Sequence, residues 1–168
     1  VPVDRVINLC DFNTIYDVPL FLKDEKVDEI VMDILGLKPK KNYLINPADW
    51  KRFVDNINKP NNEIIIGITG KYTGLHDSYL SILNALEHSA PYLNAKIKLK
   101  WIETTNINKD NVENELKNVD GIIVPGGFGE RGVEGKIECI RYSRENKIPF
   151  LGLCYGFQMA VIEYARNI

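Results

Sequence analysis

The chain has 168 residues, of which 45% are hydrophobic and 26% charged, and 21 Lys and Arg against 23 Asp and Glu give a formal net charge of −2. This length suits one domain, or one domain with part of another, and the apolar content is enough for a hydrophobic core. A charge near zero argues against binding to nucleic-acid phosphates. The longest apolar runs are far shorter than the roughly 20 residues that cross a bilayer. We therefore expect neither a nucleic-acid nor a membrane partner.

The three cysteines are an odd number and lie far apart in the sequence, at Cys10, Cys139 and Cys154. No two of them have the spacing of zinc ligands, and this usage is more typical of a reducing compartment than of a disulfide-stabilised secreted protein. We expect a cytoplasmic protein, with no metal site and no evident cofactor within this chain.

Residues 1–62 predict helices but no clear set of strands. Apolar residues recur at helical spacing from Val27 to Leu35, and Gly36 is a natural helix stop. The same spacing runs from Trp50 to Ile57. This segment alone offers no sheet around which a domain could form.

From residue 63 onward, the pattern alternates between strands and amphipathic helices. The runs 63–69 and 120–125 are typical of buried strands, and 96–102 alternates with period two, as a strand with one wetter face does. The expected strands are 63–69, 96–102, 120–125 and 148–153. The expected helices are 75–86, 112–119, 133–146 and 155–166. Alternation of this kind predicts an α/β fold with a mostly parallel sheet and helices on both faces. Ligands bind such sheets beyond the carboxyl ends of the strands, so the loops that follow the strands are the candidate sites.

The most specific motif is Gly-Leu-Cys-Tyr-Gly, from Gly152 to Gly156, between an expected strand and an expected helix. It matches the nucleophile elbow G-x-[S/C]-x-G, with Cys154 as the nucleophile. The glycines leave room for a tight turn, and the start of a helix stabilises the negative charge of a thiolate. The Tyr155 N–H would face a developing oxyanion. The alternative is a small buried cysteine beside two packing glycines, and the flanking strand and helix favour the catalytic interpretation.

A glycine-rich loop, Pro-Gly-Gly-Phe-Gly-Glu-Arg-Gly, occupies residues 125–132 after another expected strand. Its last six residues, from Gly127 to Gly132, match the dinucleotide fingerprint G-x-G-x-x-G, which leaves an NAD-binding module as a third, weaker hypothesis. The next strand ends without the acidic residue that holds a ribose, which argues against that function. We expect the loop to face the elbow and to supply a second oxyanion donor. A flexible surface turn is the alternative.

The loop at residues 67–73 contains Gly-Lys but is not a phosphate-binding P-loop. Its first glycine has the wrong spacing, and Tyr72 stands where a Ser or Thr is required. Lys71 and Tyr72 follow the end of a strand, so they either line the site or pack locally.

A thiolate nucleophile needs a base, usually a histidine, which in elbow enzymes follows the nucleophile in the chain. Both histidines, His76 and His88, precede Cys154. We expect neither of them to be the catalytic base.

These motifs resemble the CTP synthase family. Residues 120–168 resemble its class I glutamine amidotransferase domain and read DGIIVPGGFGERGVEGKIECIRYSRENKIPFLGLCYGFQMAVIEYARNI. Residues 70–90, GKYTGLHDSYLSILNALEHSA, also resemble this domain. Residues 3–22, VDRVINLCDFNTIYDVPLFL, are similar to the end of the family's synthetase domain.

The resemblance implies a flavodoxin-like class I amidotransferase fold, truncated at the C-terminus. It divides the chain into the end of a synthetase domain (1–46), a linker (47–62) and the first part of an amidotransferase domain (63–168). In this family the catalytic His and Glu lie downstream, and the nucleotide P-loop and the UTP site lie upstream. We therefore expect a piece of a longer protein that is inactive alone.

The resemblance also implies roles for individual residues. Cys154 would attack the side-chain amide of glutamine, and Phe128 lies in the loop that faces the GTP activator. The positions that match the glutamine and oxyanion contacts are Gly127, Tyr155, Gly156, Phe157 and Gln158. The positions that match the ATP-contacting segment are Cys10, Asp11 and Phe12.

The chain departs from the family at three of these positions. The family usually has a basic or polar residue at position 10, so we expect Cys10 to contribute through its backbone. It commonly has Leu and Met where this chain has Tyr155 and Phe157. The Tyr155 N–H is unaffected by this change, whereas its ring is placed to reshape the glutamine entrance.

For the intact protein, the resemblance implies glutamine, UTP, ATP with Mg²⁺, and GTP as activator. The expected reaction is ATP-dependent amination of UTP to CTP, by a homo-oligomer that is typically a tetramer. The alternative function is a catalytically silent interaction or assembly module that keeps the elbow without a complete triad.

Overall fold

The computed structural model describes residues 1–38, 47–71 and 76–168. The chain forms two compact units, Val1–Asn61 and Asn62–Ile168. This division lies next to residue 63, where the amidotransferase part was expected to begin. The assignment of residues 1–46 to a synthetase domain, of 47–62 to a linker and of 63–168 to an amidotransferase domain stays a prediction.

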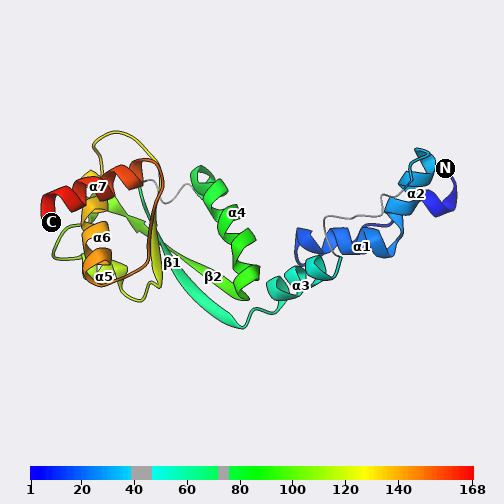
Figure 1. Cartoon of the computed structure of the whole chain (residues 1–168), viewed down its shortest axis with the longest axis horizontal. Helices are drawn as coiled ribbons and strands as arrows, with labels where there is room; N and C mark the ends of the chain where they lie inside the picture. Colours follow the sequence, from blue (N-terminus) through cyan, green and yellow to red (C-terminus); the bar gives the residue numbers. More distant parts are fainter. Residues whose placement is uncertain (39–46, 72–75) are drawn as a thin grey trace. The chain divides into compact units, whose positions relative to one another are not determined.

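The first unit consists of helices (Figure 1). They are α1 (Val18–Asp24), α2 (Val27–Ile34) and α3 (Pro47–Asn58), with 3₁₀ turns at Val3–Arg5 and Ile15–Asp17. Tyr16, Trp50 and Phe53 form an aromatic cluster with ring centroids 5.3–6.1 Å apart, and the Trp50 indole N–H donates to the Tyr16 carbonyl at 3.1 Å. The helices expected around 27–35 and 50–57 are confirmed. Helix α1 was not expected, because its seven residues are too short to show a helical period.

The second unit contains a four-stranded parallel sheet in the order β2-β1-β3-β4. Its strands are β1 (Asn62–Gly70), β2 (Ala95–Glu103), β3 (Gly121–Val124) and β4 (Phe150–Gly152). Its helices are α4 (Leu80–Ser89), α5 (Val112–Leu116), α6 (Val133–Glu145) and α7 (Tyr155–Asn167), with 3₁₀ turns at His76–Tyr79, Ala90–Leu93 and Thr104–Asn106. The predicted parallel α/β architecture is confirmed.

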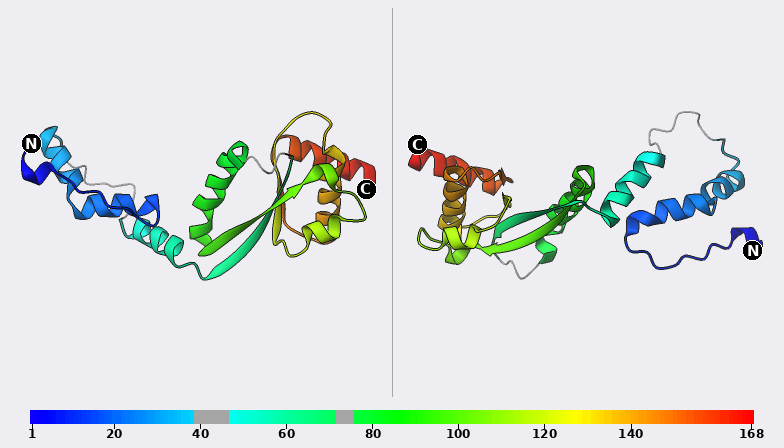
Figure 2. Two further views of the ribbon diagram at one scale, coloured as in Figure 1. Left: turned by 180° about the vertical axis from the view of Figure 1, so that it is seen from behind. Right: turned by 90° about the horizontal axis from the view of Figure 1, so that it is seen from below.

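Helices cover both faces of this sheet, with α4 on one side and α5, α6 and α7 on the other (Figures 1 and 2). Successive side chains of a strand point to opposite faces of the sheet. Ile122 and Val124 belong to the core cluster that includes Ile137 and Met159. Ile123 belongs to the second cluster, with Ile68 and Tyr79.

The structure corrects three details of the sequence prediction. Helix α5 ends at Leu116 rather than at 119, because Asn118 adopts a left-handed conformation with φ of +63°. The segment 76–79 is a 3₁₀ turn, so the helix expected from residue 75 begins only at Leu80. Strand β4 has three residues, Phe150–Gly152, instead of the six expected.

Within the described ranges, no helix has the length and apolar character needed to cross a bilayer.

Two Arg–Glu pairs link α6 to α7, and they differ in burial. The Glu163 carboxylate is 1% exposed and accepts Arg144 N–H groups at 2.8–3.2 Å. The Glu134 carboxylate is 73% exposed and accepts from Arg166 at 2.9 Å. The two pairs make the same kind of contact in different surroundings, so comparing them shows how burial changes the contribution of an ion pair to stability.

We expect Glu163→Ala to lower the free energy of unfolding by about 2–3 kcal/mol, because it removes a buried hydrogen-bonded carboxylate and leaves Arg144 with only the weaker ion pair to Glu145, at 3.6 Å. Glu134→Ala should change stability little, as exposed ion pairs do. Urea denaturation of the two variants measures both effects. Equal losses of stability in the two variants would show that the buried pair contributes no more to the free energy of unfolding than the exposed pair.

Candidate nucleophile elbow and oxyanion loop

The glycine-rich loop and the elbow follow neighbouring strands, β3 and β4, at the same edge of the sheet. A Cβ built on Gly126 would lie 3.8 Å from the Cys154 Cβ. A Cβ built on Gly127 would lie 3.9 Å from Cδ1 of Tyr155. The two loops that the sequence predicted to face each other are therefore in contact.

Cys154 lies between β4 and α7, with φ of +49° and ψ of −104°. L-residues rarely adopt this conformation, and such strain is typical of functional sites. The turn is tight on both sides of the cysteine. A Cβ on Gly156 would overlap the Val124 carbonyl oxygen, and a Cβ on Gly152 would lie 2.7 Å from the Phe157 nitrogen. The side chain of Cys154 is exposed, which is the geometry of a nucleophile elbow.

Two backbone amides near Cys154, those of Gly127 and Tyr155, have no partner among the described residues. Tyr155 begins α7, so its amide also lies at the positive end of a helix. A nucleophile beside two free N–H donors is what acyl transfer through an oxyanion requires. The assignment of these two amides as oxyanion donors stays a prediction.

Three side chains hold carbonyl groups of the glycine-rich loop. Lys71 Nζ donates to the Phe128 carbonyl at 2.6 Å, and the Tyr155 hydroxyl donates to the Gly129 carbonyl at 2.8 Å. Lys136 Nζ lies 3.5 Å from the Pro125 carbonyl. Lys71 therefore contacts the site region, as one of its two interpretations expected, whereas Tyr72 lies outside the described residues.

Sequence reasoning missed Lys136, which is 3% exposed. Burial lowers the pKa of its ammonium, and the charge of Lys71 lowers it further. The signal was present in the sequence, because Lys136 shares a helical face with Val133, Ile137 and Ile140. A charged residue on an otherwise apolar helix face indicates a specific environment.

The remaining predicted residues around the elbow differ in accessibility. Gly156 is buried beneath the turn, whereas Phe157 and Gln158 are exposed on the first turn of α7. Phe128 is 81% exposed at the tip of the glycine-rich loop. The three exposed side chains are open to a ligand, and their binding roles stay predictions.

Cys10, Asp11 and Phe12 lie in the first unit, before the 3₁₀ turn at Ile15–Asp17. Cys10 and Asp11 are exposed, while the Phe12 ring packs against Phe21 with centroids 5.3 Å apart. Their predicted contact with ATP is not tested.

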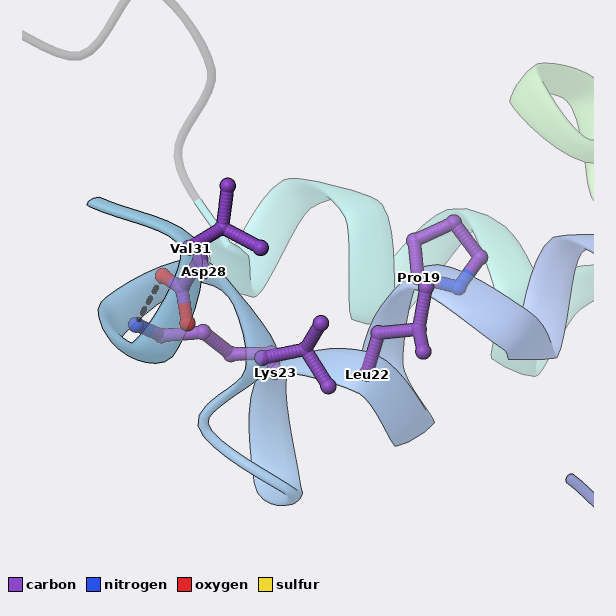
Figure 3. A pocket seen from close by; sticks show the side chains of 6 residues that line it. Pro19, Leu22, Lys23, Asp28 and Val31 are labelled. Carbon is purple, nitrogen blue, oxygen red and sulfur yellow. Dashed lines mark hydrogen bonds and ion pairs between the residues drawn. The ribbon is translucent and has the colours of Figure 1, made fainter. Parts of the chain in front are cut away.

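A separate hollow lies between α1 and α2, beside the ion pair of Lys23 with Asp28 at 2.7 Å (Figure 3). Its lining residues are Pro19, Leu22, Lys23, Val27, Asp28 and Val31. The predicted nucleotide-binding residues are not among them. Within the described ranges, no three His, Cys, Asp or Glu side chains gather as a metal site.

His88 lies away from the elbow. His88 is near the C-terminal end of α4, which leads to the start of β2, whereas Cys154 follows the carboxyl end of β4. The two residues therefore belong to opposite edges of the parallel sheet. The side chain of His76 lies outside the description.

Cys139 is fully buried, and desolvation raises the pKa of its thiol from about 9 to about 12. We expect iodoacetamide to label Cys10 and Cys154 in the native chain but not Cys139, because only a thiolate reacts readily and this thiol is inaccessible. Mass spectrometry of tryptic peptides measures the labelling, with urea-unfolded chain as the control. Native labelling of Cys139 at the rate of Cys10 would contradict this burial.

The same thiol gives a pH dependence of stability. Well below pH 9 the Cys139 thiol is protonated in both the folded and the unfolded chain, so its contribution to the free energy of unfolding is fully present. Between pH 9 and about 12 the unfolded chain loses the proton while the folded chain keeps it, so stability falls by up to about 1.4 kcal/mol per pH unit. Cys139→Ala should lack this slope in urea denaturation across the same pH range.

Comparison with known proteins decides the family. The model of glutamine amidotransferase class-I matches residues 74–168, more than half of the chain and all of the elbow region. The chain belongs to the class I glutamine amidotransferase family.

Within this family, the chain is similar to CTP synthases over nearly its whole length. It is 47% identical over 165 residues to the CTP synthase of Clostridium acetobutylicum, with 98% of this chain and 30% of the relative covered. It is 46% identical over 169 residues to that of Sulfolobus acidocaldarius, with 100% and 31% covered. The chain therefore spans about a third of these relatives.

A solved structure supports the same similarity. The glutaminase domain of Trypanosoma brucei CTPS with bound acivicin matches with a TM-score of 0.58 and 37% identity. The match covers 62% of this chain and 41% of that one. The predicted resemblance to CTP synthase and the amidotransferase fold class are thus confirmed.

Proposed function

We propose that this chain is the nitrogen-supplying part of a CTP synthase, which hydrolyses glutamine at Cys154 and passes ammonia on for amination of UTP. The observation that carries the proposal is the strained Cys154 at the start of α7, in contact with the glycine-rich loop and flanked by two amides that donate to none of the described residues. The 42–49% identity to CTP synthases supports the choice of this amidotransferase among the members of the family.

In the first step, the Cys154 thiolate attacks the side-chain amide carbon of glutamine. The carbonyl oxygen becomes an oxyanion, which accepts hydrogen bonds from the N–H groups of Gly127 and Tyr155. Collapse of this intermediate breaks the C–N bond and releases ammonia, once a general acid has protonated the nitrogen. A thioester between Cys154 and the glutamyl group remains.

In the second step, water attacks the thioester through a second oxyanion at the same donors. The C–S bond breaks, glutamate leaves, and Cys154 is free for another cycle. The acid and base of both steps would be a His oriented by a Glu, as the resemblance implies. The exposed Phe157 and Gln158 are placed to contact the incoming glutamine, and the exposed Phe128 is placed to contact a GTP activator.

In the whole protein, ammonia would react with UTP that ATP, bound with Mg²⁺, has activated. Cys10, Asp11 and Phe12 would contribute to the ATP site. The chain supplies the exposed Asp11 carboxylate and backbone groups there, and the Phe12 ring fixes the segment on α1.

The experiment compares two nitrogen sources in the full-length gene product. CTP formation from UTP and ATP should proceed with either glutamine or ammonia. Cys154→Ala should abolish the glutamine-dependent reaction and keep the ammonia-dependent one. Loss of both reactions would overturn this division of labour, and normal glutamine-dependent synthesis by the variant would favour the silent-module alternative.

A further inference from the structure

The hydrogen bonds of the glycine-rich loop flank the amide that would hold the oxyanion. Lys136 contacts the Pro125 carbonyl at the start of the loop, and the Tyr155 hydroxyl holds the Gly129 carbonyl near its end. Gly127 lies between these two points. A Cβ built on Gly127 would lie 3.6 Å from Lys136 Nζ, so the ammonium lies on the side of Gly127 to which a side chain would project.

The position of Lys136 is electrostatically unfavourable. It is the fourth residue of α6, where the helix dipole disfavours a cation, and it is 3% exposed. Within the described part of the chain, its ammonium has one long hydrogen bond and lies 5.4 Å from the centroid of the Tyr155 ring, a cation–π distance. Burial lowers its pKa. A destabilising buried charge against Gly127 and Tyr155, the two residues whose amides flank Cys154, is typical of a functional position.

Tyr155 connects the two halves of the site. Its backbone N–H is one of the two amides that donate to none of the described residues, and its hydroxyl holds the loop that carries the other amide. Its ring also lies against Lys136, on α6. A leucine at this position could fill the space but could not donate to Gly129 or interact with the ammonium.

We propose that Tyr155 and Lys136 are positioning residues for glutamine hydrolysis, which hold the loop at residues 125–129 so that the Gly127 N–H faces the oxyanion. This inference rests on the proposed function. Neither the Tyr155 hydroxyl nor the Lys136 ammonium takes part in bond making or breaking. They act through the backbone of the loop.

The test uses Tyr155→Phe and Lys136→Met in the full-length gene product. Each variant should lower kcat for glutamine hydrolysis about tenfold and change KM less than about twofold, because the oxyanion exists in the transition state and not in bound glutamine. Hydrogen–deuterium exchange of the loop peptide should become faster in both variants. The matched controls are Tyr164→Phe, an exposed tyrosine on the same helix, and Lys147→Met, an exposed lysine after α6.

Stability separates positioning from a structural role. Lys136→Met removes a desolvated charge and keeps an apolar side chain of similar length, so the melting temperature should stay the same or rise by about 2–4 °C. A lower kcat in a protein that is no less stable cannot come from unfolding.

Each outcome decides between the two proposals. If wild type hydrolyses glutamine and both variants keep its kcat, the positioning inference is wrong and the proposed function stands. Equal loss in Tyr164→Phe would also overturn the inference. If wild type itself does not hydrolyse glutamine, the proposed function and the inference fall together.

Discussion

Replacing Gly156 with alanine is expected to destabilise the second unit by about 3 kcal/mol and to reduce glutamine hydrolysis at least about 100-fold. The new Cβ would overlap the Val124 carbonyl oxygen, which belongs to strand β3 and accepts the Leu153 N–H at 2.9 Å. Either the strand or the start of α7 must move, and overpacking against backbone is costly. A shift of about 1 Å at Cys154 is enough for the expected loss of rate.

Gly126→Ala is the matched control for the stability effect. Its Cβ would meet the Cys154 Cβ at 3.8 Å and the Leu153 carbonyl oxygen at 3.9 Å, both ordinary contacts. We expect its free energy of unfolding to stay within about 1 kcal/mol of wild type. Urea denaturation measures both variants, and wild-type stability of Gly156→Ala would show that the turn is looser than the structure indicates.

Replacing Cys154 with alanine is expected to lower the rate of glutamate release by about 10⁴-fold or more. Without the sulfur no thioester can form, and removal of a covalent nucleophile has effects of this size in related acyl-transfer chemistry. The fold should be kept, because the Cys154 side chain is exposed and no core residue depends on it. A coupled glutamate assay on the full-length gene product measures the rate.

Cys139→Ala is the matched control, because it makes the same replacement of cysteine by alanine at a position away from the elbow. This cysteine is buried in the core with Ile137 and Ile140 and cannot reach a ligand. Its variant should lose some stability and keep glutamine hydrolysis. Activity that survives Cys154→Ala but not Cys139→Ala would place the nucleophile elsewhere.

The elbow could be predicted from the sequence because its determinants are local. Gly152, Cys154 and Gly156 stand within five residues, and the strained conformation of the cysteine follows from the turn that they build. The contact with the glycine-rich loop was also predictable, since both loops follow strands of one parallel sheet. Adjacent strands bring their carboxyl ends together.

The side-chain contacts that hold the loop could not be predicted. The bond from Tyr155 to Gly129 spans 26 residues, and it depends on how α7 is rotated against the loop. The contact between Lys136 and Tyr155 requires the rotation of α6 as well. These angles are set by packing in the core, which a pattern of apolar residues indicates only coarsely.

The length of β4 was mispredicted for a different reason. The run Ile148 to Leu153 is apolar and predicts a strand of six residues, whereas β4 has three residues, Phe150–Gly152. In the described residues β4 pairs only with β3, and the preceding Pro149 has no N–H to extend the ladder. Apolar composition alone does not show which strand lies at the edge.

Glutamine hydrolysis at this elbow requires that Cys154 form a covalent bond to the glutamyl group of glutamine. The most direct measurement is mass spectrometry of the full-length gene product after treatment with acivicin, the compound bound in the similar Trypanosoma brucei glutaminase domain. We expect one adduct, on the peptide that contains Cys154, with glutamine protecting against it and with Cys10 unmodified. An adduct on Cys10 instead, or labelling of Cys154 that glutamine does not slow, would show that Cys154 is not the nucleophile.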